Sequence, residues 1–489
     1  MPPEPQKKRH TLLTFGYCGT RYFGLQNQGL ESEEPPTVAA AVRAALLAAG
    51  FIAGSNFSPL ARTKWDLASR TDRGVHACCA AASVKLETRA ADVEPVGSSW
   101  QLSTSAIERI NSALAAGGAA DVRVFSGSGV RKRFSARDCA SSRTYEYLVP
   151  LDAVGAAGGA AEFDRALRTF EGTHRFHNFA SGLREREDPS RVYEGWPLAV
   201  SLRDTSSSTH RSVLTCRVHR EVEVEGVPYL VLRVAGLAFV LHQIRHMVGA
   251  ALAVSHGLVP RDVLLPALSS PLKVDVAPLA PGAGLLLDSV EFFDLGSGEH
   301  EVVLPREARE AMEAYKEDTL YPHIHSALHS ASEQADAGQG QPSSFAGFVE
   351  SLRAGRAVRY SPQDYDRLRR AAAAYSSRRA EAREEMRAKR EERRRRELAA
   401  AGDEPRAAPA TLQPSLPSGL LVALCTRQQV LPGPGAHAEL RRLRAELEAG
   451  DIEPGRGVEY YVDHASARET RRGVRVRKTR DGNPGIPVS

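Results

Sequence analysis

The sequence changes character near Gly298, and this change limits which part of the chain can form a folded core. Residues 10–298 contain short apolar runs at strand or helix spacing, separated by glycine-containing turns. The later residues are rich in Ala, Arg, Glu, Gln and Pro, which can bury little apolar surface. We therefore expect the fold and the functional site to lie before Gly298.

Strands and helices are mixed in residues 10–298 without a strict βαβ alternation, which indicates an α+β fold. Alternating apolar residues predict strands at 10–19, 78–86, 121–125, 142–149, 213–223, 229–234 and 285–293. Helical spacing predicts helices at 37–50, 103–114, 163–170, 239–255 and 304–321.

The pattern divides the chain into six segments. They are a first half at 10–127, a second half at 128–298, a trailing helix at 299–325, a linker at 326–363, an Arg/Glu/Ala-rich helix at 364–401, and a Pro-rich linker with a basic extension at 402–489. No run of 18 apolar residues occurs, so we expect no transmembrane helix and no membrane partner.

The net charge of +5 comes from one segment of the chain. Residues 366–397 contain 13 Lys or Arg and 7 Asp or Glu, an excess larger than the whole surplus. The remaining residues are close to neutral, so bulk charge gives no evidence that the folded part binds nucleic acid. That evidence has to come from local arrangements of side chains.

The stretch from Leu67 to Ala77 has the highest density of reactive side chains. Asp72 lies between Arg70 and Arg73, and Gly74 follows before an alternating apolar run. This pattern predicts a turn that presents Asp72 beside a strand, where two cations would keep the carboxylate ionised. Such a carboxylate can act as a nucleophile or a general base. The structural alternative is an ordinary charged surface turn.

One further pattern is consistent with RNA recognition. Arg131, Lys132, Arg133 and Arg137 surround one aromatic residue and precede a strand that carries Tyr145. Basic residues beside an aromatic strand suit single-stranded or flipped-base RNA, although an exposed cationic loop and a half-buried strand would look the same.

Arg245 falls on the apolar side of the predicted helix at 239–255. A buried arginine needs a carboxylate partner, and Asp72 is a candidate. The alternative is an arginine that extends its charged end to the surface.

We expect no metal site. The six cysteines are scattered, and none has zinc-binding spacing with another cysteine or histidine. His174, His177 and Asn178 are clustered, but a hydrogen-bonded structural loop is favoured because no third ligand lies nearby.

Five motifs in chain order give the sequence a resemblance to the TruA-type tRNA pseudouridine synthases over roughly residues 10–295. They are Tyr17-x-Gly-x-x-Tyr-x-Gly-x-Gln26, Ser69-Arg-Thr-Asp-Arg-Gly-Val-His-Ala77, Phe134-Ser-Ala-Arg137 with Arg143-Thr-Tyr-Glu-Tyr147, Phe239-x-x-x-Gln-Ile-Arg-x-Met-Val-Gly249, and Ala280-Pro-Gly-x-Gly-Leu285. Further details resemble the eukaryotic multisite branch. Cys18, Ser69 and His246 depart from the family's usual residues.

The resemblance implies a role for each of five residues. Asp72 would be the catalytic carboxylate, and Arg245 would form an ion pair with it. Arg70 would fill the space in the RNA helix left by a flipped uridine. Tyr145 would stack on that uridine and help to move a proton, and Leu285 would pack on the other side of the base. The resemblance also suggests weaker RNA contacts by Arg21, Gln26, Arg131, Lys132, Arg133, Arg137, Arg143 and His246.

The implied fold has two pseudo-symmetric halves that share a mixed, mostly antiparallel sheet, with flanking helices and a central cleft. The implied reaction isomerises uridine in tRNA to pseudouridine without metal or organic cofactor. Asp72 would act either as a nucleophile at the sugar or as a base at C2′, and the sequence leaves both open. A catalytically idle RNA-binding or tRNA-folding protein on the same scaffold is the alternative.

Partners and location are less constrained. The branch implies tRNA as the partner, with snRNA and mRNA as further candidates, for a monomer or homodimer. The basic run 387–396 can serve as a nuclear import signal, which favours the nucleus over mitochondria or cytoplasm; the structural alternative is a charged helix.

Overall fold

The computed structural model describes most of the chain before residue 401. The described residues are 5–26, 37–155, 159–181, 192–193, 196–197, 209–274, 276–292, 302, 304–330, 345–358, 361–400, 421–426, 458–463 and 474–475. Most of the predicted linker and basic extension at 402–489 therefore lies outside them. Its described strands are β14 (Leu421–Thr426), β15 (Val458–Asp463) and β16 (Val474–Arg475), which form a small antiparallel sheet.

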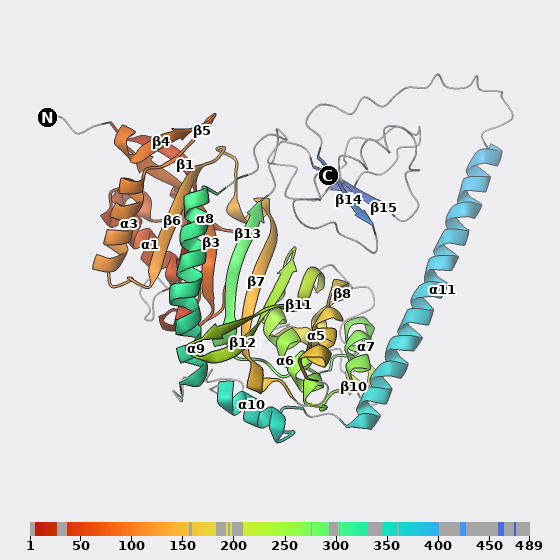
Figure 1. The fold of residues 1–489 in the computed structure, drawn as a ribbon. Coiled ribbons are helices and arrows are strands. Elements are labelled where there is room, and N and C mark those ends of the chain that lie inside the picture. Colours follow the sequence, from red (N-terminus) through yellow and green to blue (C-terminus); the bar gives the residue numbers. More distant parts are fainter. Residues whose placement is uncertain are drawn as a thin grey trace.

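One large sheet forms the centre of the molecule (Figure 1). Its strand order is β4-β5-β6-β1-β3-β13-β7-β12-β11-β8, and the short strand β2 also pairs with β3. The first half contributes β1 (Lys7–Tyr17), β2 (Asp66–Leu67), β3 (His76–Thr88), β4 (Val93–Val96), β5 (Ser99–Leu102) and β6 (Val122–Gly129). The second half contributes β7 (Ala140–Pro150), β8 (Gly172–Arg175), β11 (His210–Val224), β12 (Val227–Gly236) and β13 (Leu285–Phe292).

The two halves meet at the only parallel pairing in the described part of this sheet. Leu286 of β13 lies opposite His76 of β3, while the other described pairs are antiparallel. This confirms the expected mixed, mostly antiparallel sheet with flanking helices. Parallel strands begin at the same edge of a sheet. The segment before His76, which contains Asp72, therefore lies near the start of β13 at Leu285.

Each half contributes helices that flank the sheet. The first half has α1 (Val38–Ala48) and α3 (Thr104–Ala116), and the second has α5 (Gly159–Arg168), α6 (Gln243–Ser255) and the short α7 (Leu264–Ser269). Thr37 and Ser103 cap α1 and α3 by accepting hydrogen bonds from the amides of Ala40 and Ala106. These caps agree with the predicted helix starts.

The helix predicted at 239–255 begins later than expected. It starts at Gln243 because His242 adopts a left-handed backbone conformation, with φ 60° and ψ 10°. Arg245 therefore lies in the first turn of α6 and not in its middle. All residues of α6 are buried, which explains its apolar sequence.

A long helical segment contacts the strands on the face of the sheet opposite the one that carries Tyr145. It comprises α8 (Arg306–Tyr315), a π-helical turn (Lys316–Leu320) and α9 (Tyr321–His329), and so extends past the predicted end at 321. Side chains alternate across a strand, so Tyr145 and Glu146 of β7 point to opposite faces. Glu146 accepts a hydrogen bond from the Tyr321 hydroxyl at 2.7 Å, which places the segment on the face away from Tyr145.

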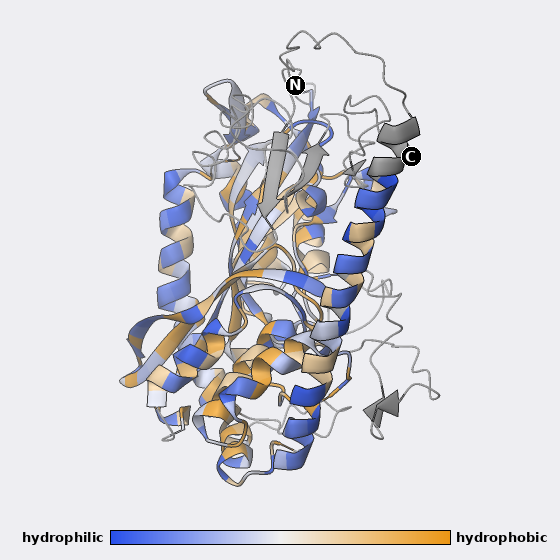
Figure 2. Ribbon diagram, turned by 90° about the vertical axis from the view of Figure 1, so that its right-hand side faces the viewer, coloured by the Kyte–Doolittle hydropathy of each residue, from blue (hydrophilic) through white to orange (hydrophobic). Residues whose placement is uncertain are grey.

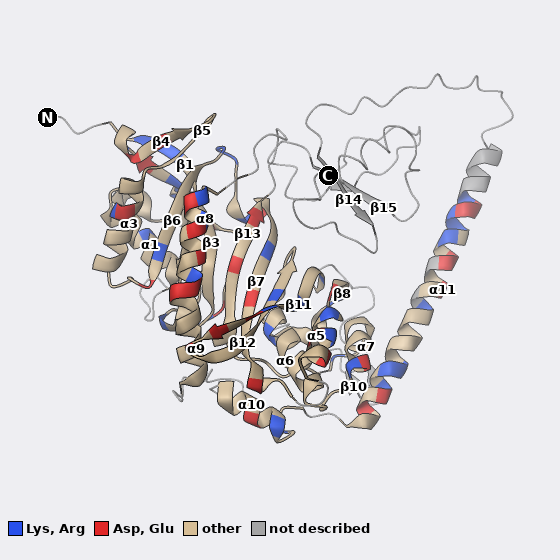
Figure 3. Ribbon diagram, viewed as in Figure 1, with Lys and Arg blue, Asp and Glu red and all other residues tan. Residues whose placement is uncertain are grey.

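Two helices correct the expected boundaries after residue 330. Helix α10 (Phe345–Arg353) lies inside the predicted linker at 326–363 and buries Phe348 and Leu352. Helix α11 (Pro362–Ala400) was expected to contribute nothing to a core, yet its first turns bury Leu368 and Tyr375 and contact α7. The described residues beyond Tyr375 are mostly exposed and hydrophilic (Figure 2) and carry charges of both signs (Figure 3).

No helix among the described residues has the length and hydrophobicity needed to cross a membrane.

Candidate active site

A pocket of about 550 Å³ lies at the junction of the two halves. Its walls come from α1, the loop between β2 and β3, β7, the loop before α6, and the start of β13. Most of the predicted site residues line it: Gln26, Arg70, Asp72, Arg137, Arg143, Tyr145, Arg245 and Leu285. The topology therefore gathers residues that are more than 200 positions apart in the sequence.

The loop that carries Asp72 is fixed by the glycine-rich turn after β1. The Tyr17 hydroxyl lies 2.7 Å from the Thr71 hydroxyl, and the amide of Leu25 donates to the Thr71 carbonyl at 3.2 Å. Gly24 has φ +83°, and a Cβ there would lie 2.6 Å from the same carbonyl. The turn thus approaches the loop more closely than a larger residue would allow. The Asp72 side chain is held there with 31% of its surface exposed.

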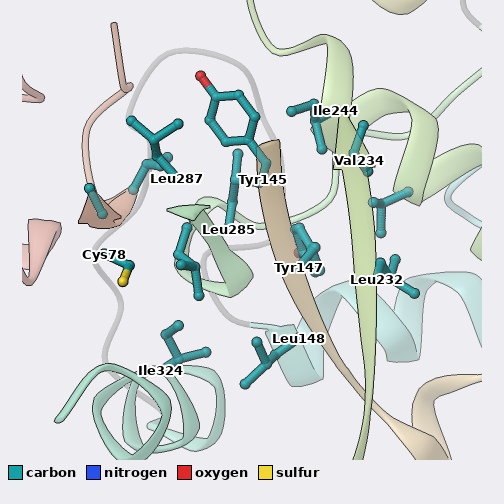
Figure 4. Packing of buried hydrophobic residues seen from close by; sticks show 14 of the residues in the cluster. Cys78, Tyr145, Tyr147, Leu148, Leu232, Val234, Ile244, Leu285, Leu287 and Ile324 are labelled. Atoms are coloured by element: carbon teal, nitrogen blue, oxygen red, sulfur yellow. The ribbon is translucent and has the colours of Figure 1, made fainter. Parts of the chain in front are cut away.

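Tyr145 and Leu285 form an apolar wall beside this carboxylate. Tyr145 lies on β7 and Leu285 begins β13, and both are almost completely buried. Figure 4 shows the Tyr145 ring beside Leu285 and Leu287, with Ile244 on its other side. The Phe239 ring packs edge-on against Tyr145 with 5.4 Å between ring centroids. Burial raises the pKa of Tyr145 to about 12, so its phenol is neutral at pH 7.

The start of α6 forms a polar wall. Arg245 is buried, and its Nε donates to the carbonyl of Ala280 at 2.6 Å. Arg245 and Asp72 line the same pocket, and their ion pair stays a prediction. His242 also points into this region, with Nε2 3.6 Å from Oδ2 of Asp72.

Cations outnumber carboxylates in the pocket. Arg43, Arg70, Arg137, Arg143 and Arg245 line it, against Asp66 and Asp72. The Asp66 carboxylate accepts a 2.6 Å hydrogen bond from the Ser135 hydroxyl. This balance gives the cleft the positive local charge that a nucleic-acid backbone requires, although the chain outside residues 366–397 is nearly neutral.

Arg143 lines the pocket but has a structural task as well. Its guanidinium donates to the carbonyls of Ala68 at 2.6 Å and Leu237 at 2.7 Å. These bonds connect β7 to the strand that leads toward Asp72 and to the segment before α6. Burial lowers the pKa of Arg143. Its guanidinium donates to backbone carbonyls and needs no acidic partner for these contacts.

Five predicted RNA contacts do not line the pocket. Arg131, Lys132 and Arg133 are exposed outside it. The guanidinium of Arg21 is paired with Asp121 at 3.0 Å. His246 corrects the expectation of a phosphate contact, because it is buried and both ring nitrogens have protein partners. Its Nδ1 lies 3.0 Å from the Ala277 carbonyl and its Nε2 3.0 Å from the Ser181 hydroxyl.

The lining residues that the sequence did not indicate include Arg43, Phe239 and His242. Arg43 lies in an otherwise apolar helix, whose pattern gives no sign that this residue lines a pocket. Phe239 and His242 fall in a motif that was assigned to the body of a helix. The spacing of Phe239 and Gln243 gave no sign that the chain turns sharply between them.

The described residues contain one group of side chains that could ligate a metal ion. Ligand atoms of Cys18, His76 and His323 lie within 4.8 Å of one another, although the three residues are far apart in sequence. One nitrogen of each imidazole already has a partner, since the amide of Gly19 donates to Nδ1 of His76 and Thr20 bonds Nε2 of His323. This group lies outside the pocket lining.

The histidine cluster predicted at 174–178 is structural, as expected. His177 contacts the carbonyl of Leu272 at 3.0 Å, and the Asn178 side chain donates to the carbonyls of Ala267 and Leu272. The carbonyl oxygen of the same amide accepts from the amide of Val274. These hydrogen bonds therefore connect the loop at 177–178 to residues 267–274 of the second half.

Comparison with known proteins gives one family match and several relatives. Residues 166–292 match the family described as tRNA pseudouridine synthase, a range that contains Arg245 and Leu285 but not Asp72. A mouse protein named Pseudouridylate synthase 1 homolog is 29% identical over 341 residues, which cover 66% of this chain and 71% of the relative.

Two fungal proteins are more distant. A Candida glabrata protein named tRNA pseudouridine synthase 1 is 24% identical over 382 residues, covering 60% of this chain and 62% of the relative. A Saccharomyces cerevisiae protein named tRNA pseudouridine(27/28) synthase is 23% identical over 357 residues, covering 57% of this chain and 83% of the relative.

Proposed function

We propose that this chain, which belongs to the TruA-type tRNA pseudouridine synthase family, isomerises uridine in tRNA to pseudouridine in the pocket lined by Asp72. The observation that carries the proposal is the pocket itself, where a partly exposed carboxylate faces a buried tyrosine and a leucine beside several arginines. This combination suits a flipped pyrimidine, because the base can stack while its sugar reaches the carboxylate.

The target uridine has to leave the RNA helix before it can enter the pocket. Extrusion costs a few kcal/mol, which stacking on Tyr145 and packing on Leu285 would offset. The pocket volume of about 550 Å³ accommodates a nucleoside. Arg70, which is exposed at the pocket edge, is proposed to fill the vacated position in the helix.

The reaction exchanges one glycosidic bond for another. The bond from N1 to C1′ breaks, the base turns, and C5 bonds to C1′. C5 then loses a proton and N1 gains one, so the product is an isomer of the substrate. Asp72 assists either by attacking C1′ or by removing the proton from C2′, and both routes use an ionised carboxylate. The buried Tyr145 and Leu285 keep water away from the detached base.

The deciding experiment compares the wild-type chain with Asp72→Asn on unmodified tRNA, followed by mapping of pseudouridine. Asn has nearly the same shape but cannot act as a base or nucleophile, so we expect tRNA binding within a few-fold of wild type and no pseudouridine. If the wild type makes none, the enzyme proposal fails, and a tRNA-binding or tRNA-folding role becomes the better account. If Asp72→Asn still makes pseudouridine, the catalytic assignment is wrong.

The finer expectations about partners and location are also proposals. We propose that snRNA and mRNA can act as further substrates, and that the basic run 387–396 near the end of α11 directs the protein to the nucleus. Incubation with snRNA and mRNA fragments tests the first. Imaging of a fusion in which Lys389, Arg390 and Arg393 are changed to Gln tests the second. Light scattering distinguishes monomer from homodimer.

A further inference from the structure

His242 has a backbone conformation that few side chains adopt. Its φ of 60° and ψ of 10° lie in the left-handed region, which glycine occupies freely and other residues occupy at a cost. Among the described residues only Lys64 and Glu225 are other non-glycine residues with positive φ. A strained residue kept in a pocket wall indicates that its side chain is needed at that place.

The strain at His242 fixes the direction of its side chain. The carbonyl of His242 accepts a hydrogen bond from the amide of His246 at 3.0 Å, which holds it at the start of α6. From there the imidazole reaches into the pocket, with 19% of the side chain exposed and Nε2 3.6 Å from Oδ2 of Asp72. An ordinary helical φ at this position would continue the helix and turn the ring elsewhere.

We infer that His242 is a positioning residue for Asp72, holding the catalytic carboxylate in its reactive orientation through its imidazole; this inference rests on the function proposed above. The Asp72 side chain lies on a loop, so nothing in its own secondary structure restricts its rotation. A ring nitrogen that faces one carboxylate oxygen favours a single orientation of the Asp72 side chain. The separation of 3.6 Å is longer than an ordinary hydrogen bond, and exclusion of water by a bound nucleotide would shorten it.

Other charged side chains line the pocket that contains His242 and Asp72. Arg70, Arg137, Arg143 and Arg245 line the pocket together with Asp66 and Asp72. Both the imidazolium and the neutral tautomer with a proton on Nε2 direct a donor toward Asp72.

The test uses His242→Gly in the full-length chain. Glycine accepts φ 60° without strain, so the variant removes the imidazole while the backbone path is retained. We expect an unchanged or higher melting temperature, a Kd for unmodified tRNA within threefold of wild type, and a turnover number lower by about 10- to 100-fold, since orientation of a reactive group is worth that much. Added imidazole should restore part of the turnover, and His242→Asn, which tolerates left-handed φ and keeps a donor, should lose less.

The matched control is Glu225→Gly, which relieves the same backbone strain in the turn between β11 and β12, away from the pocket. Its turnover should equal that of the wild type. Turnover of His242→Gly within twofold of wild type would overturn the inference, as would a loss confined to tRNA affinity, which would make His242 an RNA contact. The proposed function fails separately, through an inactive wild type or an active Asp72→Asn.

Discussion

At the scale of single residues, the pocket separates two contributions of Tyr145, its ring and its hydroxyl. The ring is buried against Phe239 and beside Leu285, and the phenol is neutral because burial raises its pKa to about 12. Tyr145→Phe should therefore keep tRNA affinity within threefold and keep the melting temperature, because the packing is retained. Turnover should fall by tenfold or more if the hydroxyl moves a proton. Single-turnover kinetics measures this, and Tyr145→Leu, which lacks the aromatic face, is the control that should lose affinity as well.

Two buried histidines make stability depend on pH. Burial lowers the pKa of both His76 and His177 to about 3, so the native state keeps them neutral. Their contribution is complete above the unfolded pKa near 6.5 and is lost as pH falls toward 3. Each should cost about 2 kcal/mol of unfolding free energy between pH 7.5 and pH 5. Urea unfolding of His177→Asn should show a pH-dependent loss smaller by about that amount, and an identical loss would contradict the assignment.

Single residues also show which parts of the site could be predicted from the sequence. Local patterns indicated Asp72 and Tyr145 as candidates with structural alternatives, and only the family resemblance indicated Leu285. Their assembly into one pocket depends on the parallel pairing of β3 and β13, which no local pattern encodes. His242 could not be selected, because a left-handed residue other than glycine leaves no signature in the sequence.

At the scale of elements, helix starts with a capping residue were predictable and helix ends were less so. Thr37 and Ser103 marked α1 and α3 through side-chain hydrogen bonds that are local in sequence. Helix α10 was missed because its apolar residues lie in a short stretch surrounded by linker-like composition. Its stability comes from tertiary burial, which outweighs composition.

The π-helical turn between α8 and α9 places a cation behind the active-site strands. Lys316 is buried, with Nζ 2.8 Å from Asp288 of β13 and 3.7 Å from Glu146 of β7. Neighbouring acids raise the pKa of Lys316 despite the opposing effect of burial, so it stays charged. Lys316→Met would leave two carboxylates without their shared cation and should cost about 3–5 kcal/mol of unfolding free energy.

Chemical denaturation measures that loss. The matched control is Lys389→Met, which breaks an exposed pair with Glu385 on α11 and should leave stability unchanged. Adding Glu146→Gln and Asp288→Asn to Lys316→Met should recover part of the loss, because the two carboxylates that lose this cation become neutral, although Glu146 also pairs with Arg233 at 3.4 Å. A loss that is no larger than that of the control would show that the buried cluster contributes little.

At the scale of the whole molecule, the described chain after residue 330 has a buried part and an exposed part, which its composition does not distinguish. Phe348, Leu352, Leu368 and Tyr375 are buried, whereas the described residues after Tyr375 are mostly exposed. Arg369 also pairs with Asp262 beside α7 at 2.9 Å. The functional boundary is therefore expected after Tyr375, within α11, and not at the start of the predicted linker.

Three truncations test this boundary, ending at residues 400, 376 and 344. The first two keep the buried side chains of α10 and α11 and should retain the wild-type melting temperature and most pseudouridine formation, since the pocket is complete. The third exposes apolar surface on the second half and should melt at a lower temperature.

Comparing the chains ending at 400 and 376 also isolates the outer part of α11. Its cations are interspersed with acids, and two of them pair with Glu385 and Glu391. Removing it should therefore change the salt dependence of tRNA affinity by less than one unit of slope, whereas a change of several units would identify α11 as an RNA-binding arm.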